Sequence, residues 1–288
     1  MLARQNACGT NRVIPFSREP ETMDEAGPVG RKTKRPSSRS WDAVANWYIG
    51  WAGAEGSRHH RELAIPAMMK LLALQPGEHL LDIGCGAGAL APAVMAAGAR
   101  YCGLDKSSRL IAHGRRHHGG KVRLLVGEAT KLAASSSLRR EEFDAASFLL
   151  SLQDIDPLDA ALASARWALH PGGRLVIVMT HPCFRIPRQS GWGWDEARGL
   201  RYRRIDRYLT SLDIPMQEYG RKGRAGGGTT RSYHRPLQSY FAALSENGFL
   251  IDALEEIPAP APEGEGRALR LSSGDIPLFL AIRALRHR

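Results

Sequence analysis

A glycine-rich loop with a carboxylate just before it is the segment of this sequence best suited to ligand binding. Residues 80–88 read LLDIGCGAG, in which an apolar strand end is followed by Asp82 and three glycines. Glycines allow a tight turn at positive φ and a close approach of the backbone to a ligand. The first N–H groups of a following helix favour an anionic group, whereas Asp82 would repel a pyrophosphate and accept from an ammonium. The loop therefore suits a ligand with both amino and carboxylate groups.

Two further polar positions extend this predicted binding edge. Asp105 lies 21 residues after Gly84, at the end of the next expected strand, where a carboxylate can accept from both hydroxyls of a ribose. The turn Gly127-Glu128-Ala129 follows the third expected strand, where the edge of an adenine can be read. These residues predict a nucleoside-containing ligand.

The elements that must position these residues alternate between strand and helix. We expect strands at 79–83, 100–104, 122–126, 143–150, 174–179, 249–257 and 278–285, and helices at 41–52, 58–74, 89–97, 110–117, 158–169 and 237–247. This alternation is typical of a parallel sheet with helices on both faces. The fold class predicted is α/β, a doubly wound Rossmann-like sheet of seven mostly parallel strands, with an insert after the fifth strand acting as a lid.

Five motifs in order resemble those of the class I S-adenosylmethionine-dependent methyltransferases. They are DIGCGAG, GLDKS, GEA, FDAASFLLSLQD and L-x-PGGRLVIV, and the resemblance covers residues 41–180 with a further tail at 237–288. It implies S-adenosylmethionine as cofactor and residues 41–288 as the methyltransferase domain. The cofactor-binding residues that it implies are Tyr48, Asp82, Gly84, Cys85, Gly86, Gly88, Asp105, Lys106, Glu128, Ala129, Phe148, Leu149 and Gln153.

Residues 181–236 form an insert on the side where an acceptor would bind, because ligands of open α/β sheets sit beyond the carboxyl ends of the strands. The insert carries a net charge of +7 and seven of the chain's aromatic residues, with a glycine run at 226–228 expected at its tip. An aromatic, arginine-rich lid predicts a planar or anionic small-molecule acceptor. The candidate acceptor-binding residues are Phe184, Arg185, Trp192, Arg204, Tyr208 and Arg235. Its HPCFRIPRQSGWGWDE and HRPL segments resemble a bacterial methyltransferase subgroup of unassigned acceptor.

His181 and His234 are the candidate catalytic bases, since a hydroxyl acceptor must lose a proton while an amine needs only desolvation. For both, a structural hydrogen bond is the alternative. The pairs His59-His60 and His117-His118 point apart on helices, so no metal site is predicted.

Three other functions stay open from the sequence. Gly84, Gly86 and Ala89 also satisfy the G-x-G-x-x-A pattern of a dinucleotide dehydrogenase, with Asp105 at the right distance. The basic insert and leader would serve an RNA methyltransferase, although Ser151-Leu152-Gln153-Asp154 stands where base-amine methyltransferases carry a Pro-Pro-Tyr type motif. The third alternative is a non-catalytic protein that binds the cofactor.

Composition sets the remaining expectations. The chain has 288 residues, 43% of them hydrophobic, and a net charge of +11. Residues 1–40 are rich in Pro, Gly, Ser and charge and are expected to be a disordered basic leader, with Met1 or Met23 as the start. The four cysteines form no C-x-x-C pair. No apolar run approaches the roughly 18 residues that a membrane span needs, and the first residues lack the apolar stretch of a secretory signal. We expect a cytoplasmic protein without a membrane partner.

Overall fold

The central element is a seven-stranded sheet in a computed structural model that describes residues 41–219, 225–259 and 274–287. The strands lie in the order β10-β11-β5-β4-β1-β2-β3. Neighbouring strands among β1 to β5 are parallel, and β11 is antiparallel to both β5 and β10. The bounds are β1 His79–Ile83, β2 Arg100–Asp105, β3 Arg123–Val126, β4 Phe143–Leu149, β5 Leu169–Thr180, β10 Phe249–Pro258 and β11 Pro277–Arg286. The predicted Rossmann-like sheet is confirmed.

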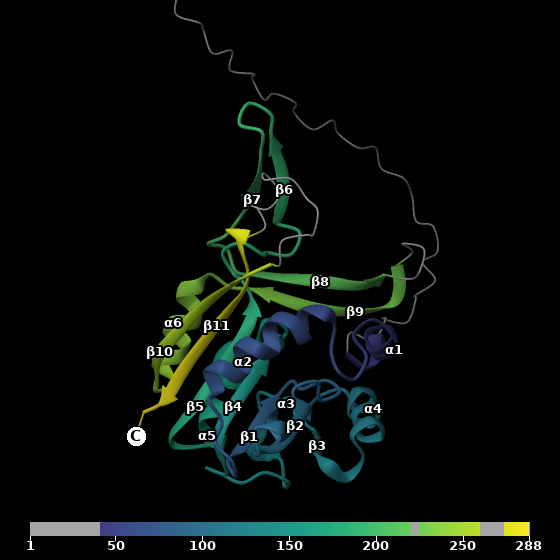
Figure 1. Cartoon of the computed structure of the whole chain (residues 1–288), viewed down its shortest axis with the longest axis vertical. Coiled ribbons are helices and arrows are strands. Elements are labelled where there is room, and N and C mark those ends of the chain that lie inside the picture. The colour runs from purple at the N-terminus through teal and green to yellow at the C-terminus, as the bar shows by residue number, and fades with distance from the viewer. Residues whose placement is uncertain (1–40, 220–224, 260–273, 288) are drawn as a thin grey trace, which may run out of the picture. The chain divides into compact units, whose positions relative to one another are not determined.

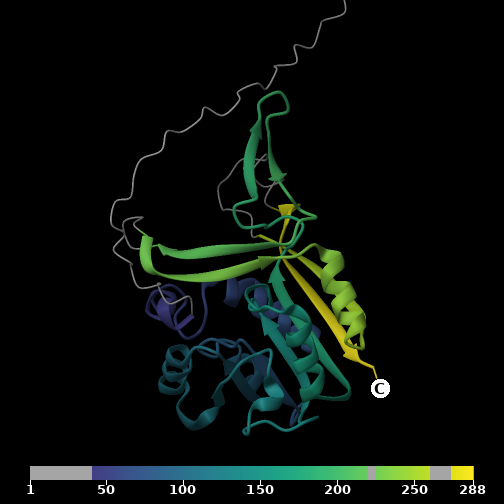
Figure 2. The same cartoon turned by 180° about the vertical axis from the view of Figure 1, so that it is seen from behind.

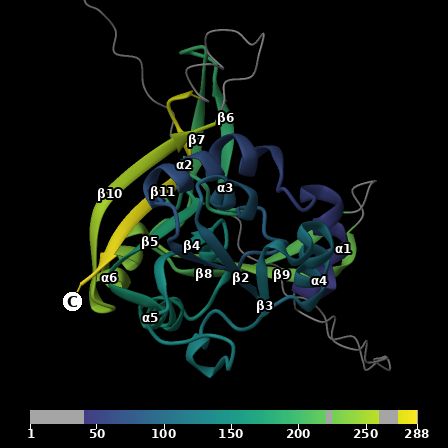
Figure 3. The same ribbon diagram turned by 60° about the horizontal axis from the view of Figure 1, so that its bottom comes forward.

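Helices cover both faces of this sheet (Figures 1 and 3). One buried apolar cluster joins the sheet to α5 and α6, and the other joins it to α2, α3 and α4. The helices are α1 Trp41–Ala52, α2 Ile65–Leu72, α3 Ala91–Ala96, α4 Ser108–His118, α5 Leu158–Ala168 and α6 Leu237–Glu246. A π-turn, His60–Ala64, precedes α2, and short 3₁₀ turns lie at 119–121, 132–134 and 152–154. No helix of the described ranges has the length and apolar character needed to cross a membrane.

The insert after β5 folds into two antiparallel hairpins (Figure 2). The first pairs β6 Ser190–Asp195 with β7 Leu200–Ile205, and the second pairs β8 Leu212–Tyr219 with β9 Ala225–His234. The glycine run 226–228 was expected at a tip but lies within β9. The run falls in the irregularity of the hairpin, between the pairs Gln217–Thr229 and Tyr219–Ala225, where glycine is common because such a bulge bends the strand. β9 packs against α1 and the turn at 152–154.

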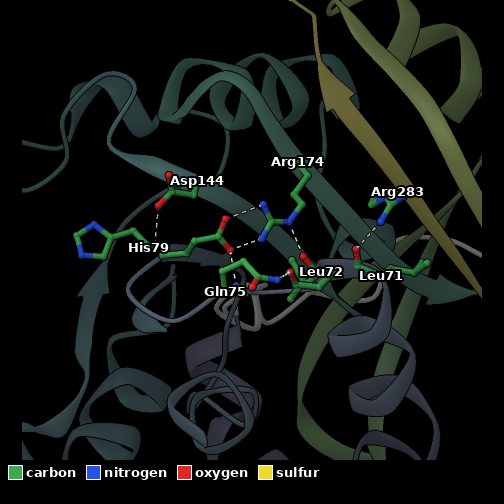
Figure 4. A network of polar contacts seen from close by, with 9 residues as sticks. Leu71, Leu72, Gln75, His79, Asp144, Arg174 and Arg283 are labelled. Carbon is green, nitrogen blue, oxygen red and sulfur yellow. Dashed lines mark hydrogen bonds and ion pairs between the residues drawn. The ribbon is translucent and has the colours of Figure 1, made fainter. Parts of the chain in front are cut away.

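A polar network near the amino-terminal ends of β1 and β5 joins these strands to α2 (Figure 4). Arg174 on β5 bonds both carboxylate oxygens of Glu78 and the carbonyl of Leu72, which closes α2. The Glu78 carboxylate also accepts from the N–H of Gln75 at 2.8 Å. The side chains of Arg174 and Glu78 are only 18% and 22% exposed. This bidentate pair therefore fixes the connection that leads from α2 into the glycine-loop strand.

Replacing Arg174 by Ala is expected to destabilise the protein by about 2–3 kcal/mol, because it leaves a half-buried carboxylate and a helix-end carbonyl without their donor. Arg174 lowers the pKa of Glu78, so its contribution is present at neutral pH and is lost as pH falls through the pKa of the folded state. Urea unfolding at pH 7 and pH 4 measures both effects. A loss of stability that is the same at both pH values would contradict this assignment.

Candidate active site

A cavity of about 380 Å³ lies where β1, β2 and β4 end. The glycine loop forms one wall, and α1 and β9 contribute to the others. Gly84, Gly86 and Gly88 have φ values of +73°, +58° and +87°, which allow the backbone to turn sharply from β1 toward α3. A Cβ on Gly86 would point toward the ring of Tyr48, 4.0 Å away, across the cavity. The loop is therefore a backbone cradle facing an aromatic ring.

Asp105 at the end of β2 holds this cradle in place. One of its carboxylate oxygens accepts from the N–H of Gly86 at 2.9 Å, and the other accepts from the N–H of Ser107 at 2.8 Å. Burial raises the pKa of Asp105, and the two N–H donors oppose that shift. The N–H groups of Gly84 and Cys85 donate to the carbonyl of Leu104. Three N–H groups of the glycine loop, those of Gly84, Cys85 and Gly86, are thus already occupied and are not free to bind a pyrophosphate.

Asp82, the last but one residue of β1, is the second carboxylate on this wall. It is 1% exposed, and its oxygens accept from the hydroxyls of Tyr101 and Ser147, both at 2.8 Å. Burial raises its pKa to about 6. Each oxygen keeps a second lone pair that can accept from a bound cationic group.

Helix α1 is anchored so that Tyr48 covers the cavity. The carboxylate of Asp42 in the first turn of α1 accepts from the Ser107 hydroxyl at 2.5 Å and from the N–H of Arg109 at 3.1 Å, at the start of α4. Trp41 and Tyr48 pack edge to face at 5.5 Å. Burial, with Asp105 and Asp154 nearby, raises the pKa of Tyr48 to about 12, so its hydroxyl stays protonated.

The lining is strongly acidic. Five carboxylates and two permanent cations face the cavity, and the acids are Asp82, Asp105, Glu128, Asp154 and Asp156. Both cations are already paired, Lys106 with Glu128 at 2.7 Å and Arg231 with Asp213. Burial lowers the pKa of His60 to about 4, which keeps that ring neutral. Such a lining favours a ligand with positive charge and disfavours a dinucleotide.

Asp154 stands apart from the glycine loop, on the turn after β4. Its carboxyl lines the cavity and bonds the hydroxyl of Ser232 on β9. Burial raises its pKa to about 7. Burial and the hydroxyl of Ser232 are the causes of that shift, and no cation of the described residues is among them, so the carboxyl has no counter-charge within that part of the chain. The sequence analysis missed Asp154, although its place just after the fourth strand was the available signal.

Most of the sequence-predicted cofactor residues line the cavity. Those that do are Tyr48, Asp82, Gly84, Cys85, Gly86, Asp105, Lys106, Glu128, Ala129 and Leu149. Gly88, Phe148 and Gln153 do not. Phe148 points into the core because side chains alternate along β4 and its neighbour Leu149 faces the cavity. The Gln153 amide donates to the carbonyl of Leu150 at 2.7 Å.

The two histidines expected as bases lie outside the cavity. The Nε2 of His181 is 2.8 Å from Glu256, and its Nδ1 accepts from the N–H of Cys183 at 3.2 Å. The Nε2 of His234 lies 2.7 Å from the carbonyl of Tyr208. Burial lowers the pKa of both rings. The structural alternative therefore describes both better than a catalytic role.

The expected acceptor-binding residues of the insert likewise bond within the protein. Arg235 pairs with Asp156 at 2.8 Å, Arg204 pairs with Asp206 at 3.1 Å, and the Tyr208 hydroxyl accepts from the N–H of Leu237 at 3.0 Å. Phe184, Arg185 and Trp192 belong to the base of the first hairpin. The insert residues that line the cavity are instead Thr230, Arg231 and Tyr233 of β9.

Comparisons with known proteins agree with this geometry. Residues 81–177 match the family model described as a methyltransferase domain. The ubiquinone/menaquinone biosynthesis C-methyltransferase of Paracoccus denitrificans is 33% identical over 115 residues, which cover 39% of this chain and 46% of that protein. A demethylmenaquinone methyltransferase of Beutenbergia cavernae is 29% identical over 111 residues, or 38% and 44% of the two chains. This chain thus spans about half the length of these relatives.

Solved structures match over more of the chain. An S-adenosylmethionine-dependent methyltransferase from Mesorhizobium loti has a TM-score of 0.61 at 28% identity, covering 77% of this chain and 96% of that one. A Listeria monocytogenes protein described as a methyltransferase of the same kind has a TM-score of 0.59 at 23% identity, covering 82% of this chain and 100% of that one, and shows the shared fold.

The fold and the matched segment make this chain similar to the S-adenosylmethionine-dependent methyltransferases, whose Mesorhizobium loti representative shares the arrangement of the sheet. Residues 81–177 match the methyltransferase domain, and the cofactor that this similarity implies is S-adenosylmethionine.

Proposed function

We propose that this protein transfers a methyl group from S-adenosylmethionine to a small-molecule acceptor that enters between α1 and β9. The observation that carries the proposal is the acid-lined cavity at the ends of β1, β2 and β4, within the matched methyltransferase domain. When bound, S-adenosylmethionine supplies a methyl group activated by a sulfonium. Five carboxylates and a glycine cradle fit a ligand that carries an ammonium and a sulfonium.

The half of the cavity that would bind S-adenosylmethionine, the donor half, is lined by residues of β1, β2 and the turn after β3. Asp105 would accept from the ribose hydroxyls, and Asp82 lies where an ammonium can be received. Glu128 and Ala129 border the space for the adenine. Tyr48 closes this half from above, so α1 and the loop exclude water together. Such alignment and water exclusion account for about 7–11 kcal/mol in comparable intramolecular reactions.

The acceptor half lies between Tyr48, Asp154 and the β9 residues Thr230, Arg231 and Tyr233. Here the β8–β9 hairpin acts as the lid. The Asp154 carboxylate takes the proton from an acceptor O–H or C–H as the acceptor atom gains the methyl group, and Ser232 orients that carboxylate. A carboxyl whose pKa is about 7 is ionised often enough near neutral pH to accept a proton and can release it again.

The charges on this side favour a planar, uncharged acceptor over an anionic one. Arg231, the cation that lines it, is held by Asp213, and Asp156 is held by Arg235. Among the described lining residues an anion would therefore find no unpaired cation, whereas the rings of Tyr48 and Tyr233 suit a flat, neutral ring. The names of the quinone-biosynthesis relatives agree with a ring acceptor.

Calorimetric titration with S-adenosylmethionine and, separately, NADH tests this function. We expect micromolar binding of S-adenosylmethionine, no binding of NADH, and at least tenfold weaker binding after Asp105→Ala, because that change removes a ribose acceptor and the partner of Gly86. Asp159→Ala removes an exposed carboxylate from α5 and should bind like the wild type. Binding of NADH instead would establish the dehydrogenase alternative. Binding of S-adenosylmethionine without its conversion to S-adenosylhomocysteine in the presence of planar phenols or quinols would favour a non-catalytic protein.

A further inference from the structure

The hairpin formed by β6 and β7 serves no purpose in the site described above. None of its residues lines the cavity, and the ribbon extends away from the seven-stranded sheet (Figures 1 and 2). Its side chains nevertheless form an organised cluster of arginine and tryptophan. The arginines and Trp192 of the cluster are half-buried, and the exposed rings of Trp194 and Tyr202 lie beside them, a composition that is typical of a binding surface.

Three guanidinium groups surround the ring of Trp192. Their carbons lie 5.0 Å (Arg201), 5.2 Å (Arg203) and 5.5 Å (Arg185) from the ring centroid. The ring attracts each cation, but the cations repel one another. Burial and the charge of Arg203 lower the pKa of Arg185 to about 10, which leaves it protonated at neutral pH.

These positive charges are held in place by neutral groups. Arg185 donates to the carbonyls of Pro277 and Ile276, at 3.0 and 3.2 Å. Arg203 donates to the carbonyl of Phe184 and the hydroxyl of Ser190, at 2.9 and 2.7 Å. Within the described ranges no carboxylate pairs with either guanidinium, whereas Arg204 pairs with Asp206. Among the described residues these guanidinium groups are thus held without a counter-charge, which an anionic partner would supply.

Flat aromatic rings lie beside this charge. Trp194 is directly opposite Arg201 in the ladder, on the face that also carries Trp192 and Arg203, and it is 53% exposed. On the other face, Tyr202 lies across Gly193, where a Cβ would come within 2.3 Å of the tyrosine ring. Tyr202 is 48% exposed. Each face therefore offers an exposed ring next to arginine.

We propose that the β6–β7 hairpin binds single-stranded nucleic acid, with Arg201 and Arg203 neutralising phosphates and Trp194 stacking on a base. Uncompensated guanidinium groups beside exposed aromatic rings are the combination by which proteins hold unpaired strands. Asp195 at the end of β6 and Glu196 after it would repel phosphates and anionic headgroups alike, so the exposed rings that can stack on bases are what favour an unpaired strand over an anionic membrane. The surface is separate from the proposed methyl-transfer site and does not depend on it.

Fluorescence anisotropy of the full chain with a labelled single-stranded RNA of about 16 nucleotides tests the proposal. We expect micromolar binding at about 50 mM salt that weakens steeply by about 200 mM. Trp194→Ala should weaken it about tenfold or more, and Arg201→Gln should lower the salt dependence by about one ion. Trp51→Ala removes another exposed tryptophan, on α1, and Arg116→Gln removes a charge from α4, so both should bind like the wild type.

Several results would overturn the proposal. They are no binding at low salt, binding that Trp194→Ala and Arg201→Gln leave unchanged, and equal binding of heparin, which has no bases to stack. Unchanged binding in both hairpin variants would place the RNA elsewhere on the chain. Binding of phosphatidylserine vesicles in preference to RNA would assign the surface to a membrane. Circular dichroism of each variant confirms its fold, since Trp194 is exposed and removing it opens no buried cavity.

Discussion

Asp154→Asn is expected to make the protein more stable at pH 8 while it abolishes methyl transfer. Burial raises the pKa of this carboxyl from 3.8 to about 7, so the folded state favours the protonated form. That preference supports folding below the unfolded pKa and is lost as pH rises through the folded pKa. At pH 8 the wild type therefore holds a buried, unpaired carboxylate, and an amide of the same shape does not carry that charge.

The expected gain at pH 8 is about 1–2 kcal/mol, less than the full pKa shift implies because Asp154 faces water in the cavity. For a domain of this size, that raises the midpoint of thermal unfolding by about 2–8 °C. The gain should be smaller at pH 5, where the folded wild type is mostly protonated. Thermal unfolding at the two pH values measures the difference. A variant that loses stability at both would give Asp154 a structural role alone.

Turnover of the same variant should fall by about 10²–10⁴-fold, since an amide cannot accept the acceptor's proton. Binding of S-adenosylmethionine should stay close to that of the wild type.

Asp82→Asn is the matched control for the gain in stability, because burial also raises the pKa of Asp82, to about 6. Both Asp82 oxygens accept hydroxyls, from Tyr101 and Ser147, and an amide keeps only one accepting oxygen. We expect that variant to be no more stable than the wild type at pH 8.

The donor side of this protein was predictable because its signals are local. A glycine loop between an apolar strand and a helix places Gly84 and Gly86 at one edge of the sheet, and Asp105 follows at the end of the next strand. In a parallel sheet the order of strand and helix along the chain determines which strand ends meet. The glycine loop and the residues up to the end of the next strand contain most of this information. The sheet and most of the residues that line the cavity beside the loop therefore followed from the sequence.

The acceptor side was less predictable because its contacts join distant parts of the chain. His181 meets Glu256 and Arg235 meets Asp156, at separations of 75 and 79 residues. Neither partner can be read from the spacing around the histidine or the arginine. Along a strand, a shift by one residue also reverses which side chain faces the site. For this reason Thr230, Arg231 and Tyr233 line the cavity where the sequence had favoured other residues of the insert.

Gly84→Ala should be the most damaging small substitution in the glycine loop. The new Cβ would lie 2.6 Å from the Cβ of Ser151, at a φ of +73° that alanine rarely adopts. The left-handed backbone costs about 1 kcal/mol, and the collision adds about 1–3 kcal/mol. Because Ser151 follows β4 and bonds the carbonyl of Ile83 at 2.8 Å, relief must come from the loop itself. We expect the loop to move and S-adenosylmethionine binding to fall below detection by calorimetry.

Gly172→Ala separates the backbone strain from the collision, because Gly172 has a φ of +80° and no atom lies within 4 Å of the Cβ that alanine would add. It should destabilise the protein by about 1 kcal/mol and leave cofactor binding intact. Adding Ser151→Gly to Gly84→Ala removes the colliding atom, so urea unfolding should recover the steric part of the loss and not the backbone part. Equal destabilisation by the two glycine variants, with no recovery in the double variant, would show that Ser151 does not confine the loop. If the double variant also recovers S-adenosylmethionine binding, the position of the loop backbone is what the donor site requires, rather than the absence of a side chain at residue 84.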